Sequence, residues 1–238
     1  NPHIAREELE QSRETMPAET YAQEIMADFE ATDSDLVYTL DRAKTVRAEL
    51  VPWNECAYHV AGIDPGGGDP TAIVPLGVTR ATRLVAPRVG SLSATGALHV
   101  SMHQYGEFRR SGDVSVDDMA EWLSARGPWS AIAVGETGGD IITTTLQRYG
   151  FPAFKADMHR ANIDSVVRWV LDQGRLTIDP ACLNSIAEFD VYRWSKKRDQ
   201  TGQSYATSTP DWTHGDLMDA RRYGVMAVVN GLPSGQRK

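Results

Sequence analysis

The feature that most constrains the fold is a buried strand that runs into a glycine-rich turn. Residues 57–64 (AYHVAGID) form a mostly apolar run that ends in an acid, and Pro65 and three glycines follow. Residues 71–78 (TAIVPLGV) form a second apolar run. Because the glycine-rich link between the two runs is short, it favours a hairpin, and we expect two antiparallel strands. Pro75 cannot donate a ladder hydrogen bond, which predicts an edge position or a bulge there.

The chain beyond this hairpin predicts one more strand and then an alternation of helices and strands. Three strands in a row followed by this alternation predict an α/β fold. The sheet should be mixed, with an antiparallel three-strand meander joined to parallel βαβ strands and helices on both faces. The predicted strands are 97–105, 131–134, 152–155 and 176–178, the helices are 115–125, 140–149, 162–173, 180–189 and 214–229, and a hairpin with a basic loop covers 191–207.

The pattern divides the chain into three parts. Residues 1–50 form a helical linker segment with helices over 2–15 and 19–30 and a short strand over 37–40. Residues 51–231 form the main domain, and residues 232–238 form a tail. The sequence starts at Asn1 rather than Met, which we interpret as a piece of a longer protein.

Charge is unevenly distributed along the chain. The net charge is -8, which by itself argues against nucleic-acid binding. Residues 1–50 carry 12 acidic and 5 basic side chains, whereas residues 191–238 carry 8 basic and 4 acidic ones. A local basic stripe can bind phosphates on an acidic protein, so the distribution keeps a nucleic-acid partner open.

Composition and cysteine content favour an intracellular protein. No apolar run approaches the ~20 residues of a membrane span, and the acidic N-terminus does not resemble a signal peptide. Cys56 and Cys182 have neither metal-ligand spacing nor a disulfide framework, which favours reduced thiols. We therefore expect no membrane association and no secretion.

Three carboxylates are expected to converge at one end of the sheet. Asp64 ends the first strand, Glu136 follows the fourth, and Asp216 opens the last helix with Asp219 one turn further on. Ligands collect at strand ends in open α/β sheets, and the first and fourth strands should be neighbours. Each acid taken alone is typical of a turn or a helix cap, so only the ordered set supports a site.

Converging carboxylates repel one another unless a cation lies between them. Oxygen ligands favour Mg²⁺ or Mn²⁺. Two such ions can activate a water and stabilise the leaving oxygen of a phosphodiester. The set therefore predicts metal-dependent cleavage of nucleic acid, leaving a 5′ phosphate and a 3′ hydroxyl.

Five segments carry a family resemblance. The sequence resembles the C-terminal nuclease domain of the large terminase subunit of tailed phages, a DNA-packaging motor. The matching segments, in the family's order, are AETYAQEIMADFE, AGIDPGGGDPTA, AVGETGGD, the VYRW hairpin and HGDLMDARRYG.

The resemblance implies a ribonuclease-H-like fold and a metal-dependent endonuclease that cuts concatemeric double-stranded viral DNA. It carries the family's acidic positions onto Asp64, Glu136 and Asp216, with Asp219 as a further metal ligand. Two Mg²⁺ or Mn²⁺ ions would act in catalysis. The implied partners are double-stranded DNA, a portal protein and the small terminase subunit, in the host cytoplasm. The isolated domain is expected to be monomeric.

The phosphate-binding motif of an ATPase, G-x-x-x-x-G-K-[ST], does not occur in the sequence, so we expect no ATP hydrolysis by this chain.

Basic side chains near the end of the chain are candidates for DNA binding. Lys196, Lys197 and Arg198 are expected at the tip of the predicted hairpin, where they would lie along the DNA backbone or form a solvated charged turn. Arg221 and Arg222, on the last helix, would contact phosphate or pair with Asp219 or Asp211. Arg109 and Arg110 follow the third strand and would extend the same basic track.

Three other functions remain open at this point. A Holliday-junction resolvase or transposase-like nuclease of the same fold would prefer branched or end-specific DNA. An actin-like ATP-binding domain would explain GIDPGGGDPT, but it needs a second phosphate-binding hairpin. A catalytically silent DNA-docking module would not need the intact acidic set.

Overall fold

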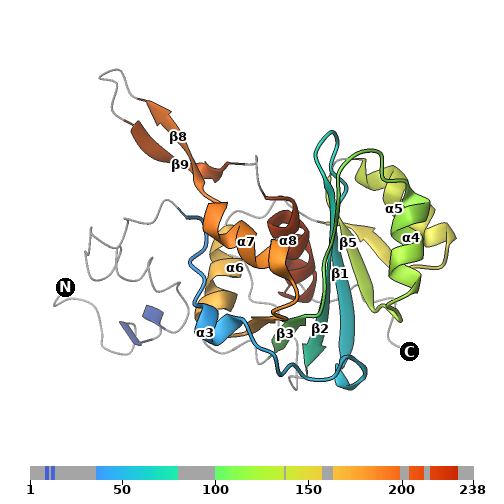
Figure 1. Cartoon of the computed structure of the whole chain (residues 1–238), viewed down its shortest axis with the longest axis horizontal. Coiled ribbons are helices and arrows are strands. Elements are labelled where there is room, and N and C mark those ends of the chain that lie inside the picture. The colour runs from blue at the N-terminus through green and yellow to red at the C-terminus, as the bar shows by residue number, and fades with distance from the viewer. Residues whose placement is uncertain are drawn as a thin grey trace.

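The chain folds around one mixed β-sheet with helices on both faces (Figure 1). The computed structural model describes residues 9–10, 12–13, 36–79, 100–136, 138–156, 163–198, 204–211 and 215–229. The helices expected over 2–15 and 19–30 and the tail 232–238 lie outside these residues, apart from four helical positions in the first of them. None of the described helices is long and apolar enough to cross a membrane.

The main sheet has the strand order β6-β5-β1-β2-β3-β7, and β4 pairs with β2 beside β3. β1 and β2 form the predicted antiparallel hairpin, and β5 lies parallel to β1, as expected for the first and fourth predicted strands. The strands are β1 (Tyr58–Asp64), β2 (Thr71–Thr79), β3 (Ser101–Gln104), β4 (Phe108–Arg110), β5 (Ala131–Val134), β6 (Ala153–Lys155) and β7 (Leu176–Ile178).

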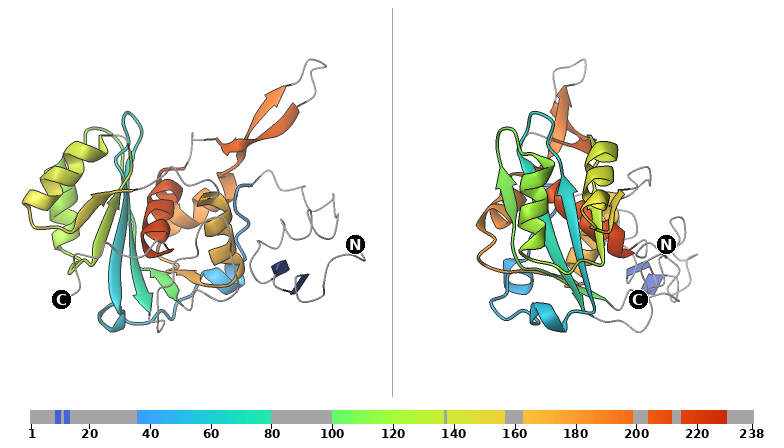
Figure 2. Two further views of the ribbon diagram at one scale, coloured as in Figure 1. Left: turned by 180° about the vertical axis from the view of Figure 1, so that it is seen from behind. Right: turned by 90° about the vertical axis from the view of Figure 1, so that its right-hand side faces the viewer.

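The helices form two layers. Figure 2 shows α4 and α5 on one side of the sheet and α6, α7 and α8 on the other. They are α3 (Arg42–Thr45), the 3₁₀ helix η2 (Trp53–Glu55), α4 (Val116–Ser124), α5 (Gly139–Arg148), α6 (Ile163–Asp172), α7 (Leu183–Val191) and α8 (Asp216–Val229).

Each face of the sheet has its own apolar core, because side chains alternate along a strand. Val60, Val74 and Leu76 pack in the core below α6, α7 and α8, whereas Ile63 and Ile73 pack in the core below α4 and α5. Asp64 follows Val60 and Gly62 at intervals of two residues along β1, so its side chain lies on the same face of the sheet, the face that α8 covers.

Helix boundaries follow the expected signals. Ser115 caps α4 by accepting the Asp118 N–H at 3.1 Å, and the Asp118 side chain accepts the Ser115 N–H in return. Gly150 and Gly174, just beyond α5 and α6, adopt the positive φ values that favour glycine at these ends.

Two strand expectations differ in detail from the structure. Pro75 lies in a central strand rather than at an edge, but the expected irregularity is present: between the β3 and β4 pairings, residues 74–75 oppose three residues, 105–107, so no ladder N–H is needed at Pro75. Its carbonyl still accepts the Tyr105 N–H at 3.4 Å. The short strand expected over 37–40 does not form either: Val37 and Tyr38 are buried without strand pairing, and Leu36 makes a single bridge to Arg193.

A separate two-stranded ribbon projects from the body beside α7 (Figure 1). It consists of β8 (Trp194–Arg198) and β9 (Ser204–Pro210), paired antiparallel. The hairpin expected over 191–207 is therefore present, but it starts later, because Val191 ends α7 and Tyr192 is buried against Tyr38.

Candidate functional site

Helix α8 brings two acids to the end of β1. The helix lies so close to β1 that a Cβ on Gly62 would come within 2.6 Å of the Gly224 backbone nitrogen. Because Gly62 faces Ala220 and Gly224, the first turn of α8 lies over the end of β1, where Asp64 stands. Asp216 and Asp219 occupy that first turn.

Glu136 stands beside Asp64 at the same edge of the sheet. Ile63 pairs with Val134 in the parallel ladder, and the Gly135 N–H donates to the Ile63 carbonyl at 2.8 Å. Glu136 is the next residue and its side chain is exposed. The expected order of Asp64 and Glu136 on neighbouring strand ends is therefore present.

The charges of two other acids act on Asp64. Burial, and after it the charges of Asp219 and Asp216, raise the pKa of Asp64 to about 8. Tyr223, one turn after Asp219, reports the same cluster: burial raises its pKa, and Asp64, Asp219 and Glu136 add to the effect. The four predicted acids thus share one electrostatic environment.

Arginines hold two of these acids. Arg109 of β4 donates to Asp216, with its Nη2 2.9 Å and its Nε 3.0 Å from Oδ2. Arg222 Nη1 lies 2.6 Å from Oδ1 of Asp219, and the Tyr192 hydroxyl donates to the same oxygen at 3.2 Å. Among the described residues, no three His, Cys, Asp or Glu side chains are grouped closely enough to bind a metal in this arrangement.

The donor set nevertheless fits a hard divalent cation. All four acids supply carboxylate oxygens, the ligands that Mg²⁺ and Mn²⁺ prefer. A carboxyl whose pKa is raised by burial and like charges is also one that a nearby cation would stabilise in its ionised form. Asp64, Glu136, Asp216 and Asp219 are therefore the residues that would hold such an ion.

Glu188 is a buried acid that sequence reasoning did not single out. It lies on α7, and its carboxylate accepts the backbone N–H groups of Leu217 at 3.3 Å and Met218 at 3.0 Å. Burial raises its pKa to about 7, while those hydrogen bonds and the nearby Arg221 act in the opposite direction. Glu188 thus replaces a local cap at the start of α8, where unpaired N–H groups need an acceptor.

The structure corrects two predicted DNA-binding residues. Arg221 and Arg222 are only 1% and 5% exposed, so their side chains cannot reach DNA in this conformation. Arg221 donates to Gln104 Oε1 at 3.0 Å and lies over the Phe189 ring, whereas Arg222 pairs with Asp219. Both arginines are buried because neighbouring elements cover α8 nearly all round.

The three basic candidates of the predicted hairpin lie along the ribbon rather than at its tip. Lys196 and Lys197 are exposed on β8, opposite Ala206 and Tyr205, and Arg198 ends the strand opposite Ser204. The strands extend further than the sequence pattern predicts, which moves these residues from the loop into the ladder. Side chains alternate along a strand, so Lys196 and Lys197 point to opposite faces of the ribbon.

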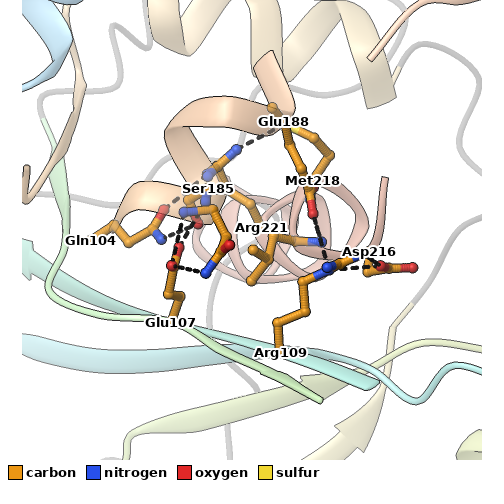
Figure 3. A network of polar contacts seen from close by, with 10 residues as sticks. Gln104, Glu107, Arg109, Ser185, Glu188, Asp216, Met218 and Arg221 are labelled. Atoms are coloured by element: carbon orange, nitrogen blue, oxygen red, sulfur yellow. Dashed lines mark hydrogen bonds and ion pairs between the residues drawn. The ribbon is translucent and has the colours of Figure 1, made fainter. Parts of the chain in front are cut away.

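A polar network connects the sheet with α7 and α8 beside this site. Figure 3 shows Arg109 rising from the sheet towards Asp216, with Arg221, Met218 and Glu188 above it in this view. Glu107 accepts hydrogen bonds from Asn184 and Ser185 at the start of α7. The site therefore rests on contacts between segments that are far apart in the sequence.

Comparison with solved structures identifies the fold as ribonuclease-H-like, the fold of large terminase nuclease domains. The large terminase of a thermophilic bacteriophage has a TM-score of 0.68 and 16% identity, over 97% of this chain and 53% of that one. The P22 large terminase nuclease domain has a TM-score of 0.56 and 18% identity, over 80% of this chain and 91% of that one.

A further similar structure is the large terminase (g2p) nuclease domain of bacteriophage SPP1 with bound Mn. It has a TM-score of 0.52 and 18% identity, over 76% of this chain and 93% of that domain. The chain spans about half the length of the thermophilic-phage large terminase. No protein-family model matches the sequence, and no curated protein matches it.

Proposed function

We propose that this chain is the nuclease domain of a phage large terminase and cuts double-stranded DNA with the help of a divalent cation. The observation that carries the proposal is the placement of Asp64 and Glu136 on neighbouring strand ends, with Asp216 and Asp219 above Asp64. The fold shared with terminase nuclease domains supports it, as does the bound Mn of the SPP1 domain.

In this proposal the four acids hold the cation. Asp64, Glu136 and Asp216 would be its main ligands, and Asp219 would be a further ligand. Divalent cations bound there would supply a water of lowered pKa and stabilise the leaving oxygen of the phosphodiester. Hydrolysis would leave a 5′ phosphate and a 3′ hydroxyl.

The projecting ribbon is the proposed DNA surface. Lys196, Lys197 and Arg198 would contact the phosphate backbone, which orients the duplex without reading its sequence. Binding of this kind should tolerate any sequence and weaken steeply with salt. It would also explain how an acidic chain binds DNA, since three basic residues follow one another on one element.

The wider setting is also a proposal. By analogy with the thermophilic-phage large terminase, of which this chain matches about half, residues 51–231 would be the nuclease domain and residues 1–50 the segment that joins it to an ATPase. The domain would act in the host cytoplasm, on concatemeric DNA held by the portal protein and the small terminase subunit. By itself it would be a monomer without ATPase activity.

The direct test is cleavage of supercoiled plasmid with Mg²⁺, Mn²⁺ or EDTA. We expect cutting only with a metal, and loss of cutting in Asp64→Ala and Asp216→Ala. Asp140→Ala is the matched control, because its carboxylate is 83% exposed and pairs only weakly with Lys155 at 3.4 Å. Equal cutting by Asp64→Ala and the parent would refute the proposed site.

The products and the preferred substrate test the rest of the scheme. End-labelling should find 5′ phosphates and 3′ hydroxyls, and 3′ phosphates would contradict the mechanism. A four-way junction should be cut no faster than linear duplex. A strong preference for the junction would instead indicate a resolvase-like nuclease of the same fold.

A further inference from the structure

Arg109 is a basic side chain that faces the candidate site from the sheet. It lies on β4, the strand that the sequence pattern did not predict, and β4 pairs with β2 next to the glycine-rich turn. Two of its nitrogens, Nη2 and Nε, lie 2.9 and 3.0 Å from the same oxygen, Oδ2 of Asp216. An oxygen that accepts two charge-assisted hydrogen bonds is poorly available to a cation.

The second neighbour of Arg109 is Glu188. The Arg109 Nε lies 3.6 Å from Glu188 Oε1, which is an ion-pair distance rather than a hydrogen bond. Glu188 is fixed in place, since its oxygens accept the N–H groups of Leu217 and Met218. Arg109 therefore lies between a fixed carboxylate and the carboxylate of a proposed metal ligand.

The burial of the three groups is unequal. The side chain of Arg109 is 35% exposed, whereas those of Asp216 and Glu188 are only 8% and 9% exposed. A shallow cavity of about 260 Å³, lined by Arg109, Asn184, Ala187, Glu188 and Val191, opens beside the guanidinium. The arginine thus has room to leave Asp216 on its outer side and still remain near Glu188.

From this geometry we propose that Arg109 is a positioning residue that holds the Asp216 carboxylate and competes with the divalent cation for its Oδ2. When the cation binds, the guanidinium gives up Asp216 and keeps its ion pair with Glu188. When the cation leaves, Arg109 neutralises Asp216, so that the first turn of α8 keeps its place over β1. This inference rests on the proposed function, because it takes Asp216 to be a metal ligand.

The proposal predicts opposite signs for two measurements on one variant. Arg109→Gln should bind Mn²⁺ about tenfold more tightly than the parent, which corresponds to about 1.4 kcal/mol, because the competitor has gone. The same variant should unfold at a lower temperature without metal, because the ion pair between Arg109 and Asp216 is lost. If Arg109 had a merely structural role, its replacement would lower both the unfolding temperature and the Mn²⁺ affinity.

The experiment is a Mn²⁺ titration of the full 238-residue chain without DNA, in which free Mn²⁺ is followed by electron paramagnetic resonance. Arg110→Gln is the matched control. It removes the same charge one residue away, and its partner Asp118 lies on α4, away from the acids. We expect its Mn²⁺ affinity to equal that of the parent.

Mn²⁺ affinity in Arg109→Gln that is equal to or lower than that of the parent would overturn the proposal. If this variant does not fold, Arg109→Lys decides by the same criterion, because a lysine places one nitrogen where arginine places two. A further arm with Asp64→Asn separates the two proposals. If Asp64→Asn abolishes Mn²⁺ binding but Arg109→Gln does not bind Mn²⁺ more tightly than the parent, only the competition is refuted. If Asp64→Asn binds Mn²⁺ as well as the parent does, the metal site itself is refuted.

Discussion

The contact between β1 and α8 predicts that Gly62→Ala is strongly destabilising. A Cβ at this position would lie 2.6 Å from the Gly224 nitrogen and 2.9 Å from the Ala220 carbonyl carbon, and the Ala220 oxygen is closer still. Ordinary contact begins near 3.4 Å, so the Gly224 nitrogen alone would have to move by 0.8 Å, and the Ala220 oxygen by more. The opposing atoms belong to the backbone, so no change of side-chain rotamer can relieve the clash.

Overpacking a core costs about 1–3 kcal/mol, and we expect the upper end here. For a domain of this size, a loss of about 3 kcal/mol lowers the midpoint of thermal unfolding by roughly 6–12 °C. Gly106→Ala is the matched control, because its Cβ would meet only the Pro75 side chain at 3.8 Å. Midpoints within about 2 °C of each other for the two variants would refute the close packing of α8 on β1.

Three further predictions follow from the site. Asp64 has a pKa of about 8 in the folded chain, above the ordinary aspartate value of 3.8. The metal-free folded state therefore binds more protons than the unfolded state between these values, and its free energy of unfolding should fall as pH rises through that window. Urea titrations should show a flatter pH profile for Asp64→Asn, and an unchanged profile would contradict the shift. Glu188→Ala removes the acceptor for the Leu217 and Met218 N–H groups, and it should cost about 3 kcal/mol in the same titrations; a loss below about 0.5 kcal/mol would show that these groups find other acceptors. Combined Lys196→Ala and Lys197→Ala should reduce the slope of log affinity for duplex DNA against log salt by about 0.9 for each phosphate that is no longer neutralised, and an unchanged slope would exclude the ribbon from the interface.

Local sequence patterns predicted most of the sheet and helices. Strands β1, β2, β5, β6 and β7 and helices α4 to α8 all lie where the runs of apolar residues and the capping signals indicate. The adjacency of β1 and β5 also followed, because few topologies join a meander to parallel units. Three-residue β4 was not predicted, since Phe108–Arg110 is too short to show a period.

The candidate site was only partly accessible from the sequence. The positions of Asp64, Glu136, Asp216 and Asp219 followed from their places at the ends of elements. The environment of Arg221 and Arg222 did not, because the apolar pattern of α8 does not reveal that the helix is buried nearly all round. Glu188 carries no local signal, as its partners are the N–H groups of a helix about 30 residues away.

The chain's local chemistry therefore determines which residues form strands and helices and which acids end them, since alternation, caps and glycines act over a few residues. The tertiary structure alone decides how those acids are paired and which basic residues remain exposed. It places Arg109 on Asp216 and Arg222 on Asp219, and it leaves Lys196 and Lys197 exposed on the ribbon. Arg109 and Asp216 are more than a hundred residues apart, so their contact exists only because α8 packs on β1 beside β4.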